Sequence, residues 1–315
     1  MLAFVVRRTI GAILVLFVVS FITYLIFVII PGGDPAQRIA GKLATHQNII
    51  DIRHKLGLDQ PFYVQYYDMM KQIFQGKLIS YSSQLNVWGQ IKQGLPATFS
   101  LCIGAAIIWL FFGILVGVIS AVTAGRWSDR VITVLALVGI SMPVFWLGIV
   151  MRYLLAERNG VFPDGEYVPL TSSPLQWFYH MLLPWFVLAV LFIGFYGRVL
   201  RSNILDAIHE DYVRTARAKG LSPRRVLLKH ILRNSMIPIV TLFGLDFAAV
   251  LGGGAILTET VFDLHGVGQY AAQSISSLDL PPIMGVTIYA TFFIVLFNAL
   301  VDFFYAYLDP RIRPS

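Results

Sequence analysis

The sequence predicts an all-α integral membrane protein with six membrane-spanning helices and a charged helical segment between the fourth and the fifth. Composition is the first reason, since 57% of the 315 residues are apolar and only 13% are charged, against about 45–50% and about 25% in soluble domains. The apolar residues also gather in runs near the roughly 20 residues that cross a bilayer. No short alternating segments suggest a β-barrel, so helices must satisfy the backbone polar groups in lipid.

Six apolar runs are long enough to be spans. They are residues 9–30, 95–122, 131–155, 181–200, 235–257 and 283–308. The first follows Arg7 and Arg8, as a secretory signal would. Its apolar core is longer than the roughly 7–15 residues of a signal, and no small-residue cleavage site follows. We therefore expect it to remain as a helix.

Basic residues in the short loops predict that both termini lie in the cytoplasm. If the six spans alternate in direction, most of the 24 Lys and Arg residues fall on one side, including nine between residues 198 and 233. Such an excess marks the cytoplasmic side. It also accounts for the net charge of +7, so we expect a membrane lipid surface and no nucleic acid as partner.

The spans divide the chain into three parts. Residues 1–30 form the N-terminal tail and first span, residues 31–94 an external loop, and residues 95–315 a five-helix core with a cytoplasmic loop at 201–234 and an external loop at 258–282. The first external loop holds a predicted amphipathic helix between Asp59–Pro61 and Gly76. Its apolar residues recur every three to four positions: Phe62, Tyr66, Met69, Met70 and Ile73. We expect this helix to pack at the outer membrane face or against the bundle.

The stretch 211–234 predicts two short helices joined by a sharp turn. Asp211 can cap the first helix, Gly220 can end it, and Ser222 followed by Pro223 can begin the second. Val213, Ala216 and Leu221 lie near one face of the first helix. Because helices this short are marginal alone in water, we expect the segment to dock on a cytoplasmic partner.

A polar residue inside a membrane span costs free energy, so its presence there indicates a functional role by default. Asp246 lies about ten residues into the fifth span and Asn298 is similarly deep in the sixth. We hypothesise that Asp246 faces a pore or a partner subunit. Pro143 predicts a kink in the third span, which either lines a path or only serves packing. Gly113 and Gly117 favour close approach of the second span to a neighbour.

The sequence shows no catalytic residues and no metal site. Cys102 is the only cysteine, the six histidines have no paired spacing, and no nucleophile lies beside a base. No G-x-x-x-x-G-K-[ST] motif is present, so the chain cannot cradle ATP in a P-loop.

Eight stretches together resemble a known family. They are PGGDP at 31–35, LGLDQPFYVQY at 56–66, LPATFSL at 95–101, GISMPVFWLG at 139–148, RTARAKG at 214–220, HILRNSMIP at 230–238, HGVGQY at 265–270 and ALVDFFYAYLDPRIR at 299–313. They resemble permeases of bacterial ATP-binding-cassette (ABC) importers, and most closely the B-type subunit of the dipeptide, oligopeptide and nickel group. Two positions depart from the pattern: Arg214 replaces the Glu of the family-wide coupling loop, as is usual in the peptide subgroup, and GKLISYSSQ at 76–84 differs from the expected stretch.

The resemblance implies the type I importer fold and one half of a heterodimeric pore in the bacterial inner membrane. The implied partners are a second homologous permease subunit, two ATPase subunits that hold ATP and Mg, and an external solute-binding protein. This chain would itself bind no cofactor and catalyse no reaction. The implied cargo is a dipeptide or short oligopeptide, with nickel chelates, glutathione or another small solute as alternatives. A self-sufficient secondary transporter would show inverted repeats, and a membrane enzyme would need clustered acids or histidines; neither is seen.

Two sets of site residues follow from the resemblance. The helix at 211–220 would sit in a groove of an ATPase through Asp211, Tyr212, Arg214, Thr215, Ala216, Arg217, Lys219 and Gly220. The loop between the fifth and sixth spans would reach the binding protein through Val261, Phe262, Asp263, Leu264, His265, Gly266, Val267 and Gly268. A simple connector explains the second set equally well.

Overall fold

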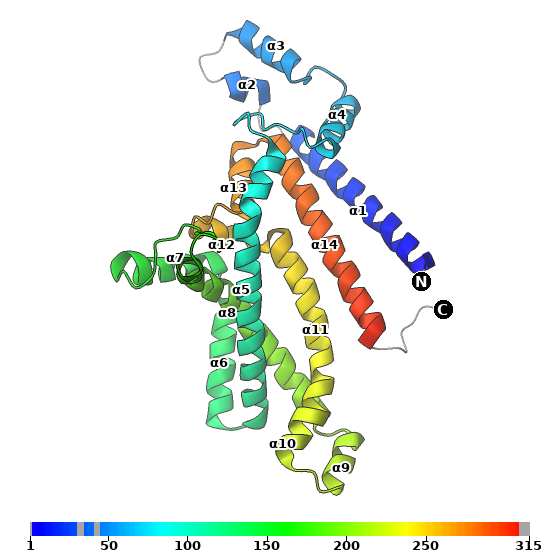
Figure 1. Ribbon diagram of the computed structural model, residues 1–315, viewed down its shortest axis with the longest axis vertical. Coiled ribbons are helices and arrows are strands. Elements are labelled where there is room, and N and C mark those ends of the chain that lie inside the picture. The colour runs from blue at the N-terminus through cyan, green and yellow to red at the C-terminus, as the bar shows by residue number, and fades with distance from the viewer. Residues whose placement is uncertain (1, 30–34, 41–44, 309–315) are drawn as a thin grey trace.

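The computed structural model describes residues 2–29, 35–40 and 45–308 and shows a helical bundle (Figure 1). Among the described residues, five helices are long and apolar enough to cross a membrane, or six if the bent pair Trp127–Ser141 with Val144–Arg158 counts as one span. The five are α1 (Leu2–Ile29), α5 (Val87–Val122), α8 (Pro174–Ala207), the continuous helix Pro223–Gly254 that contains α11 (Leu232–Ala249), and α14 (Leu280–Leu308). Residues 31–34 of the PGGDP stretch and 309–313 at the C-terminus, with Arg311 and Arg313, lie outside the described residues.

The third expected span is a broken pair of helices. α6 (Trp127–Ser141) ends before Pro143, and α7 (Val144–Arg152) leaves it at an angle of 97°. The residue before a proline is pushed out of the helical region, and Met142 is extended, with ψ 127°. The kink at Pro143 is confirmed, and beyond it α7 and the π-helical turn η1 (Tyr153–Arg158) project sideways (Figure 1).

The long helices extend beyond their apolar runs. α5 begins at Val87, eight residues before the predicted span, because the Asn86 side chain caps it by accepting a hydrogen bond from Gly89 N at 2.9 Å. α8 begins at Pro174, with Ser173 as its N-cap. Hydropathy marks the part of a helix that lies in lipid, whereas caps set where the helix begins.

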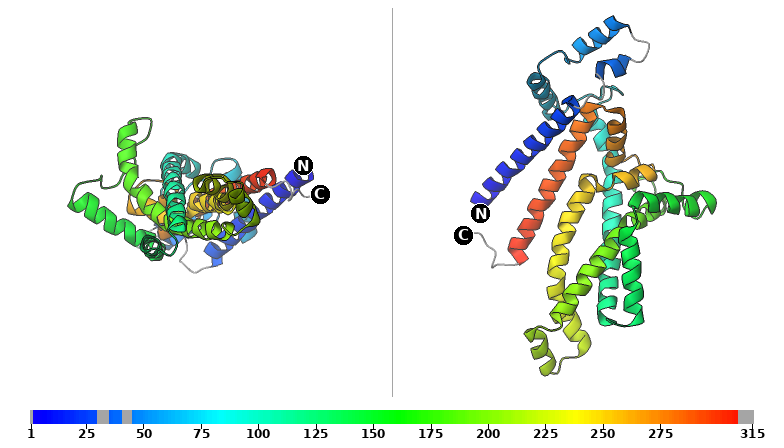
Figure 2. Two further views of the ribbon diagram at one scale, coloured as in Figure 1. Left: turned by 90° about the horizontal axis from the view of Figure 1, so that it is seen from below. Right: turned by 180° about the vertical axis from the view of Figure 1, so that it is seen from behind.

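The first external loop caps one end of the bundle, which we call the α4 end (Figure 2). It contains α2 (Pro35–Ala40), α3 (His46–Lys55) and α4 (Phe62–Phe74). α4 is the predicted amphipathic helix, and it buries Tyr66, Met69 and Ile73. Ser20 of α1 hydrogen-bonds to the Tyr66 hydroxyl at 2.8 Å, so α4 packs on the bundle.

Glycines bring α5 and α8 close together. A Cβ at Gly113 would lie 2.8 Å from Tyr196 Cβ, and one at Gly117 would lie 2.9 Å from the carbonyl oxygen of Gly197. This close approach confirms the prediction for both glycines. Trp109 is fully buried beside them, with its ring 4.4 Å from that of Phe192.

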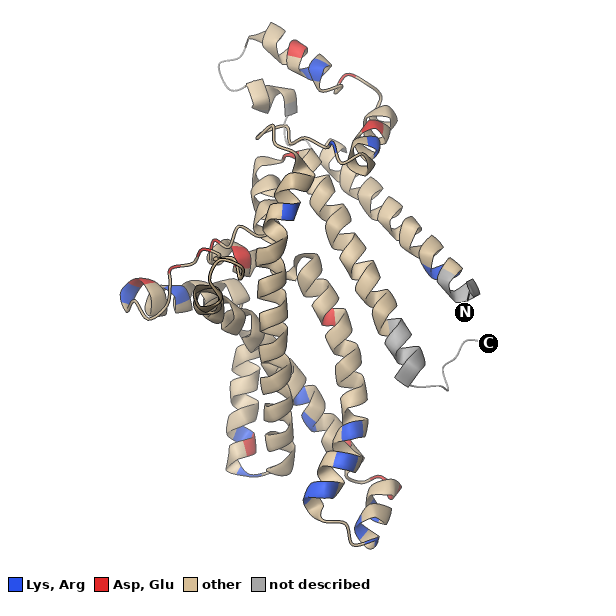
Figure 3. Cartoon of the chain, in the orientation of Figure 1, with Lys and Arg blue, Asp and Glu red and all other residues tan. Residues whose placement is uncertain are grey.

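Charges concentrate at the ends of the long helices (Figure 3). The end opposite α4, which we call the α9 end, carries α9 (Asp211–Ala218), α10 (Pro223–Val226) and the π-helical turn η2 (Leu227–Ile231), where Lys and Arg predominate. Nearer the α4 end, α11 leads into the π-helical turn η3 (Val250–Gly254), followed by α12 (Ile256–Val261) and α13 (Val267–Ser277).

Candidate functional site

The segment between α8 and α11 is a helix, a turn and a second helix, as predicted. Gly220 has φ +75°, a conformation that glycine adopts at no steric cost, and it ends α9. Ser222 is the N-cap of α10 and Pro223 its first residue. The predicted cap of α9 is wrong: Glu210 holds the N-cap position, and Asp211 lies in the first turn.

α9 presents one buried face and one exposed face. Val213 and Ala216 are buried in the same core cluster as Val226 and Ile231. The other seven predicted coupling residues are exposed: Asp211, Tyr212, Arg214, Thr215, Arg217, Lys219 and Gly220. Ala216 therefore packs on its own chain, and the exposed face carries an excess of cations.

The two ends of this segment are tied together. The Asn203 side chain on α8 donates to the carbonyl oxygen of Ser235 on α11 at 3.4 Å, and the Ser235 hydroxyl donates back to the carbonyl of Asn203 at 3.2 Å. Ser235 is buried. α8 and α11 are thus tied together at the point where the segment containing α9 leaves one helix and enters the other.

The loop that follows the fifth span, predicted to be external, is folded onto the bundle. Of the eight residues predicted to reach a binding protein, five are buried: Phe262, Leu264, Gly266, Val267 and Gly268. Val261 is half-buried, whereas Asp263 and His265 are exposed. Both exposed residues have positive φ, 49° and 55°. The exposed surface of residues 261–268 is therefore centred on Asp263 and His265.

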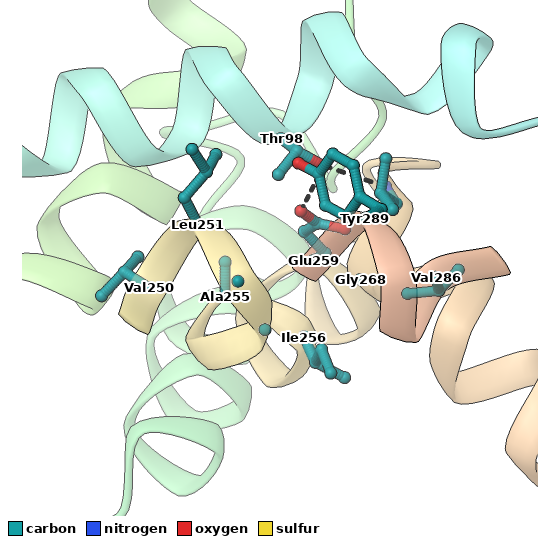
Figure 4. A pocket seen from close by; sticks show the side chains of 12 residues that line it. Thr98, Val250, Leu251, Ala255, Ile256, Glu259, Gly268, Val286 and Tyr289 are labelled. Atoms are coloured by element: carbon teal, nitrogen blue, oxygen red, sulfur yellow. Dashed lines mark hydrogen bonds between the residues drawn. The ribbon is translucent and has the colours of Figure 1, made fainter. Parts of the chain in front are cut away.

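Glu259, which was not predicted to be a site residue, holds this loop in place. Its fully buried carboxylate accepts a hydrogen bond from the Thr98 hydroxyl at 2.7 Å (Figure 4) and another from Gln269 N at 2.9 Å. Thr98 accepts in turn from Val267 N at 2.9 Å. These bonds satisfy free N–H groups at the start of α13. Burial raises the pKa of Glu259 to about 7.

One sequence signal for Glu259 was available in the glycines of HGVGQY. A Cβ at Gly266 would lie 2.3 Å from Glu259 Oε2, and one at Gly268 would lie 3.0 Å from the same oxygen. Glycine is needed where a buried side chain approaches the backbone this closely. Without the fold, nothing identifies Glu259 as the group that approaches.

The cavity beside Glu259 is small. It has a volume of about 30 Å³ and is lined by Thr98, Glu259, Tyr289 and η3, among others. The Tyr289 hydroxyl is buried there without a hydrogen-bond partner. A space of this size, with polar groups around it, holds about one water molecule. It is not a site for a peptide.

Arg152 fixes the same loop from the other side. It donates to the carbonyl oxygen of Val261 at 2.5 Å and to the carboxylate of Asp164 at 2.6 Å. The hydrogen bond from Arg152 lowers the pKa of Asp164. Glu166 N also donates to the carbonyl of Phe262 at 3.1 Å. The end of α7 and the 159–173 connection thereby hold α12.

The three residues singled out inside the spans lie on separate elements. Asp246 is half-buried on α11 and accepts a hydrogen bond from the Tyr196 hydroxyl of α8 at 2.7 Å. Within the described part of the chain no Lys or Arg pairs with it. Asn298 is half-buried on α14, and Pro143 lies at the break between α6 and α7. Across residues 2–29, 35–40 and 45–308, no group of three His, Cys, Asp or Glu residues could hold a metal.

Comparison with known proteins identifies the family. Residues 113–314 match the model of the binding-protein-dependent transport system inner membrane component. Residues 1–102 match the model of the N-terminal part of such membrane components. The chain belongs to this family. It is a multi-pass membrane permease, in agreement with the resemblance found in the sequence.

Relatives of this permease match over nearly their whole length. A putative peptide transport system permease protein of Brucella abortus (strain 2308) is 38% identical, with 99% of each chain covered. A probable D,D-dipeptide transport system permease of Escherichia coli K12 is 37% identical, covering 97% of this chain and 96% of the relative. A dipeptide transport system permease of Alkalihalophilus pseudofirmus is 36% identical, covering 99% of this chain and 100% of the relative.

Solved structures share the fold of the permease at low sequence identity. A chain of an amino acid ABC transporter solved with histidines aligns with a TM-score of 0.52 at 16% identity, covering 69% of this chain and 92% of that chain. A chain of an inward-facing methionine ABC transporter also gives 0.52 at 16%, covering 77% and 98%. The fold is that of ABC transporter permeases.

Proposed function

We propose that this permease is the B-type subunit of an ABC importer that takes up dipeptides or short oligopeptides. The observation that carries the proposal is α9, a short helix with a cationic exposed face that links α8 to α11 beside the paired hydrogen bonds of Asn203 and Ser235. Such a helix suits the docking of a partner that moves. The peptide substrate is supported by relatives whose names state peptide or dipeptide transport.

The assembly contains four further components. A second, homologous permease subunit completes the pore, two ATPase subunits bind ATP and Mg, and an external solute-binding protein delivers the cargo. The permease lies in the bacterial inner membrane, with both termini and α9 in the cytoplasm. The basic excess at the α9 end supports this orientation.

α9 transmits the motion of the ATPases to the spans. Its exposed face sits in a groove of one ATPase, where Arg214 and Arg217 pair with acidic side chains. Rigid-body rocking of the ATPase pair displaces α9, and α8 and α11 move with it, so that access alternates between the two sides. At the opposite end, Asp263 and His265 are the residues of the external loop that meet the binding protein.

Asp246 faces the translocation path or the second permease subunit. A carboxylate within a span is costly without a partner, and Tyr196 supplies a single hydrogen bond. In the assembled importer, water of the path or a polar group of the second subunit completes its solvation.

Reconstitution tests the proposed function. The permease is co-expressed with the products of its neighbouring genes, purified through a tag on this chain, and placed in liposomes with the binding protein. We expect two ATPase subunits and a second permease to co-purify, and radiolabelled dialanine to enter only with ATP. Competition by dipeptides, with none by nickel chelates or glutathione, supports the peptide substrate. Uptake by this chain alone on an ion gradient contradicts the proposal.

A further inference from the structure

A buried ion pair fastens α6 to α8 at the α9 end of the bundle. Arg201 of α8 donates two hydrogen bonds to the Asp129 carboxylate of α6, Nε to Oδ1 and Nη2 to Oδ2, each at 2.8 Å. Ser120 of α5 donates to Oδ1 at 2.5 Å, and Gly125 N donates to Oδ2 at 3.0 Å. The carboxylate of Asp129 therefore joins α5, the α5–α6 turn, α6 and α8 through four hydrogen bonds.

The pair is well protected from water on the Asp129 side. The Asp129 side chain is 6% exposed and that of Arg201 is 30% exposed. A forked Arg–carboxylate contact fixes orientation as well as distance, which a lysine cannot reproduce. The contact therefore specifies how α6 sits on α8.

Arg201 lies close to the coupling segment along the chain. It precedes the end of α8 at Ala207 by about two helical turns, and α9 begins at Asp211. Its neighbours Leu200 and Ile204 are fully buried, in the same core cluster as Val213 of α9. Any tilt of the end of α8 is thus imposed on α6 through Asp129.

The other end of the α6–α7 arm is fastened as well. Arg152, at the end of α7, holds the carbonyl of Val261 in the external loop. Between the two fastenings, α6 and α8 are in close contact, since a Cβ at Gly194 would lie 2.6 Å from the carbonyl oxygen of Ala136. One arm therefore connects the coupling end of α8 with the loop on the other side of the bundle.

We propose that Asp129 and Arg201 are positioning residues that couple the movement of α9 to the α5–α6 hairpin and, through α7, to the external loop. This inference rests on the proposed function. If the Asp129–Arg201 pair only stabilised the fold, its loss would reduce the amount of assembled importer. It would not change the number of substrate molecules transported per ATP hydrolysed. The ratio of ATP hydrolysed to substrate transported separates the two roles.

The experiment measures that ratio in liposomes that contain the complete importer and radiolabelled dialanine. Arg201→Lys keeps the positive charge but cannot form the two parallel hydrogen bonds to Asp129. Arg201→Ala removes both the charge and the hydrogen bonds. Ser120→Ala removes one hydrogen bond to Asp129 without leaving a charge unpaired. Arg198→Ala is the matched control, because Arg198 lies on the same helix with an exposed side chain. The amount of assembled complex is measured for each variant by size-exclusion chromatography.

We expect assembled Arg201→Ala importer to hydrolyse ATP at close to the normal rate while the ATP used per dialanine rises about tenfold, as expected for losing charge-assisted hydrogen bonds. Arg201→Lys and Ser120→Ala should show smaller rises, and Arg198→Ala none. If the Arg201→Ala importer does not assemble, the ratio of ATP to dialanine in the Arg201→Lys and Ser120→Ala importers tests the inference instead.

Two results overturn the inference: an unchanged ratio in every assembled variant, or hydrolysis and transport that fall in proportion to the assembled amount. Failure of the proposed function is distinguishable, since a wild-type importer that lacks ATPases or transports without ATP is detected before any variant is compared.

Discussion

At the residue scale, Glu259 makes the external loop sensitive to pH. Its pKa is raised from 4.5 to about 7 by burial, although hydrogen bonds from Thr98 and Gln269 act in the opposite direction. A carboxyl with a raised pKa favours its neutral form in the folded state. The contribution of Glu259 to stability is therefore greatest below about pH 4.5 and is lost as the pH rises through about 7.

We predict that the purified permease in detergent melts at a lower temperature at pH 8 than at pH 5. The free-energy difference due to Glu259 is roughly 2–4 kcal/mol. Glu259→Gln, which cannot ionise, should remove most of this difference. Scanning calorimetry at both pH values measures the effect, and an equal pH dependence in wild type and Glu259→Gln would show that another group is responsible.

At the element scale, the glycines between α5 and α8 set how closely the two helices pack. We predict that Gly117→Ala destabilises the permease by about 1–3 kcal/mol, a typical cost of overpacking. The added Cβ would lie 2.9 Å from both the Gly197 oxygen and Leu200 Cβ. Gly11→Ala on α1 is the control, because nothing lies within 4 Å of its Cβ position. Equal melting temperatures for the two variants would contradict this account.

The exposed face of the helix α9 gives a second prediction at the element scale. We predict that Arg217→Glu reduces the amount of co-purifying ATPase about tenfold, because a new carboxylate meets acidic groups in the groove. The variant should melt within about a degree of the wild type, since surface changes are nearly neutral in stability. Lys71→Glu, at an exposed position on α4, controls for the change in net charge and should leave co-purification unaltered.

The element scale also shows why the sharpness of the break in the third span could not be predicted. Residues 131–155 are apolar throughout, and hydropathy contains no information about direction. Pro143 indicated a kink, because proline removes a backbone donor and restricts its predecessor. The angle of 97° depends on what α7 packs against, including the contact of Arg152 with Val261, which is 109 residues distant.

At the scale of the whole molecule, local signals predicted the spans, the helix–turn–helix of α9 and α10, and the amphipathic α4. Each of these depends on residues within a few turns of one another. The contacts of Glu259 and Asp129 could not be predicted, because Thr98 lies 161 residues from Glu259 and Arg201 lies 72 residues from Asp129. A lone acid in a sequence gives no indication of its partner.

The role of Asp246 belongs to the scale of the whole importer, because in the proposed assembly Asp246 faces the translocation path or the second permease subunit. We predict that Asp246→Asn leaves the amount of assembled importer unchanged and lowers dialanine transport about tenfold, in line with the functional default for ionisable residues within spans. Uptake into liposomes, normalised to assembled complex, measures this. Wild-type uptake by the Asn variant would contradict a role in the path or at the subunit interface.

The central claim is that α9 transmits the work of separate ATPases to this permease, and cysteine cross-linking tests it most directly. Cys102 is the only cysteine and is buried, so Arg217→Cys provides a single accessible thiol on α9. In the assembled importer, a short thiol-to-amine cross-linker at this position should capture an ATPase subunit, whereas Lys71→Cys on α4 should capture none. An Arg217→Cys importer that assembles, transports dialanine with ATP and yields no ATPase cross-link would contradict the claim.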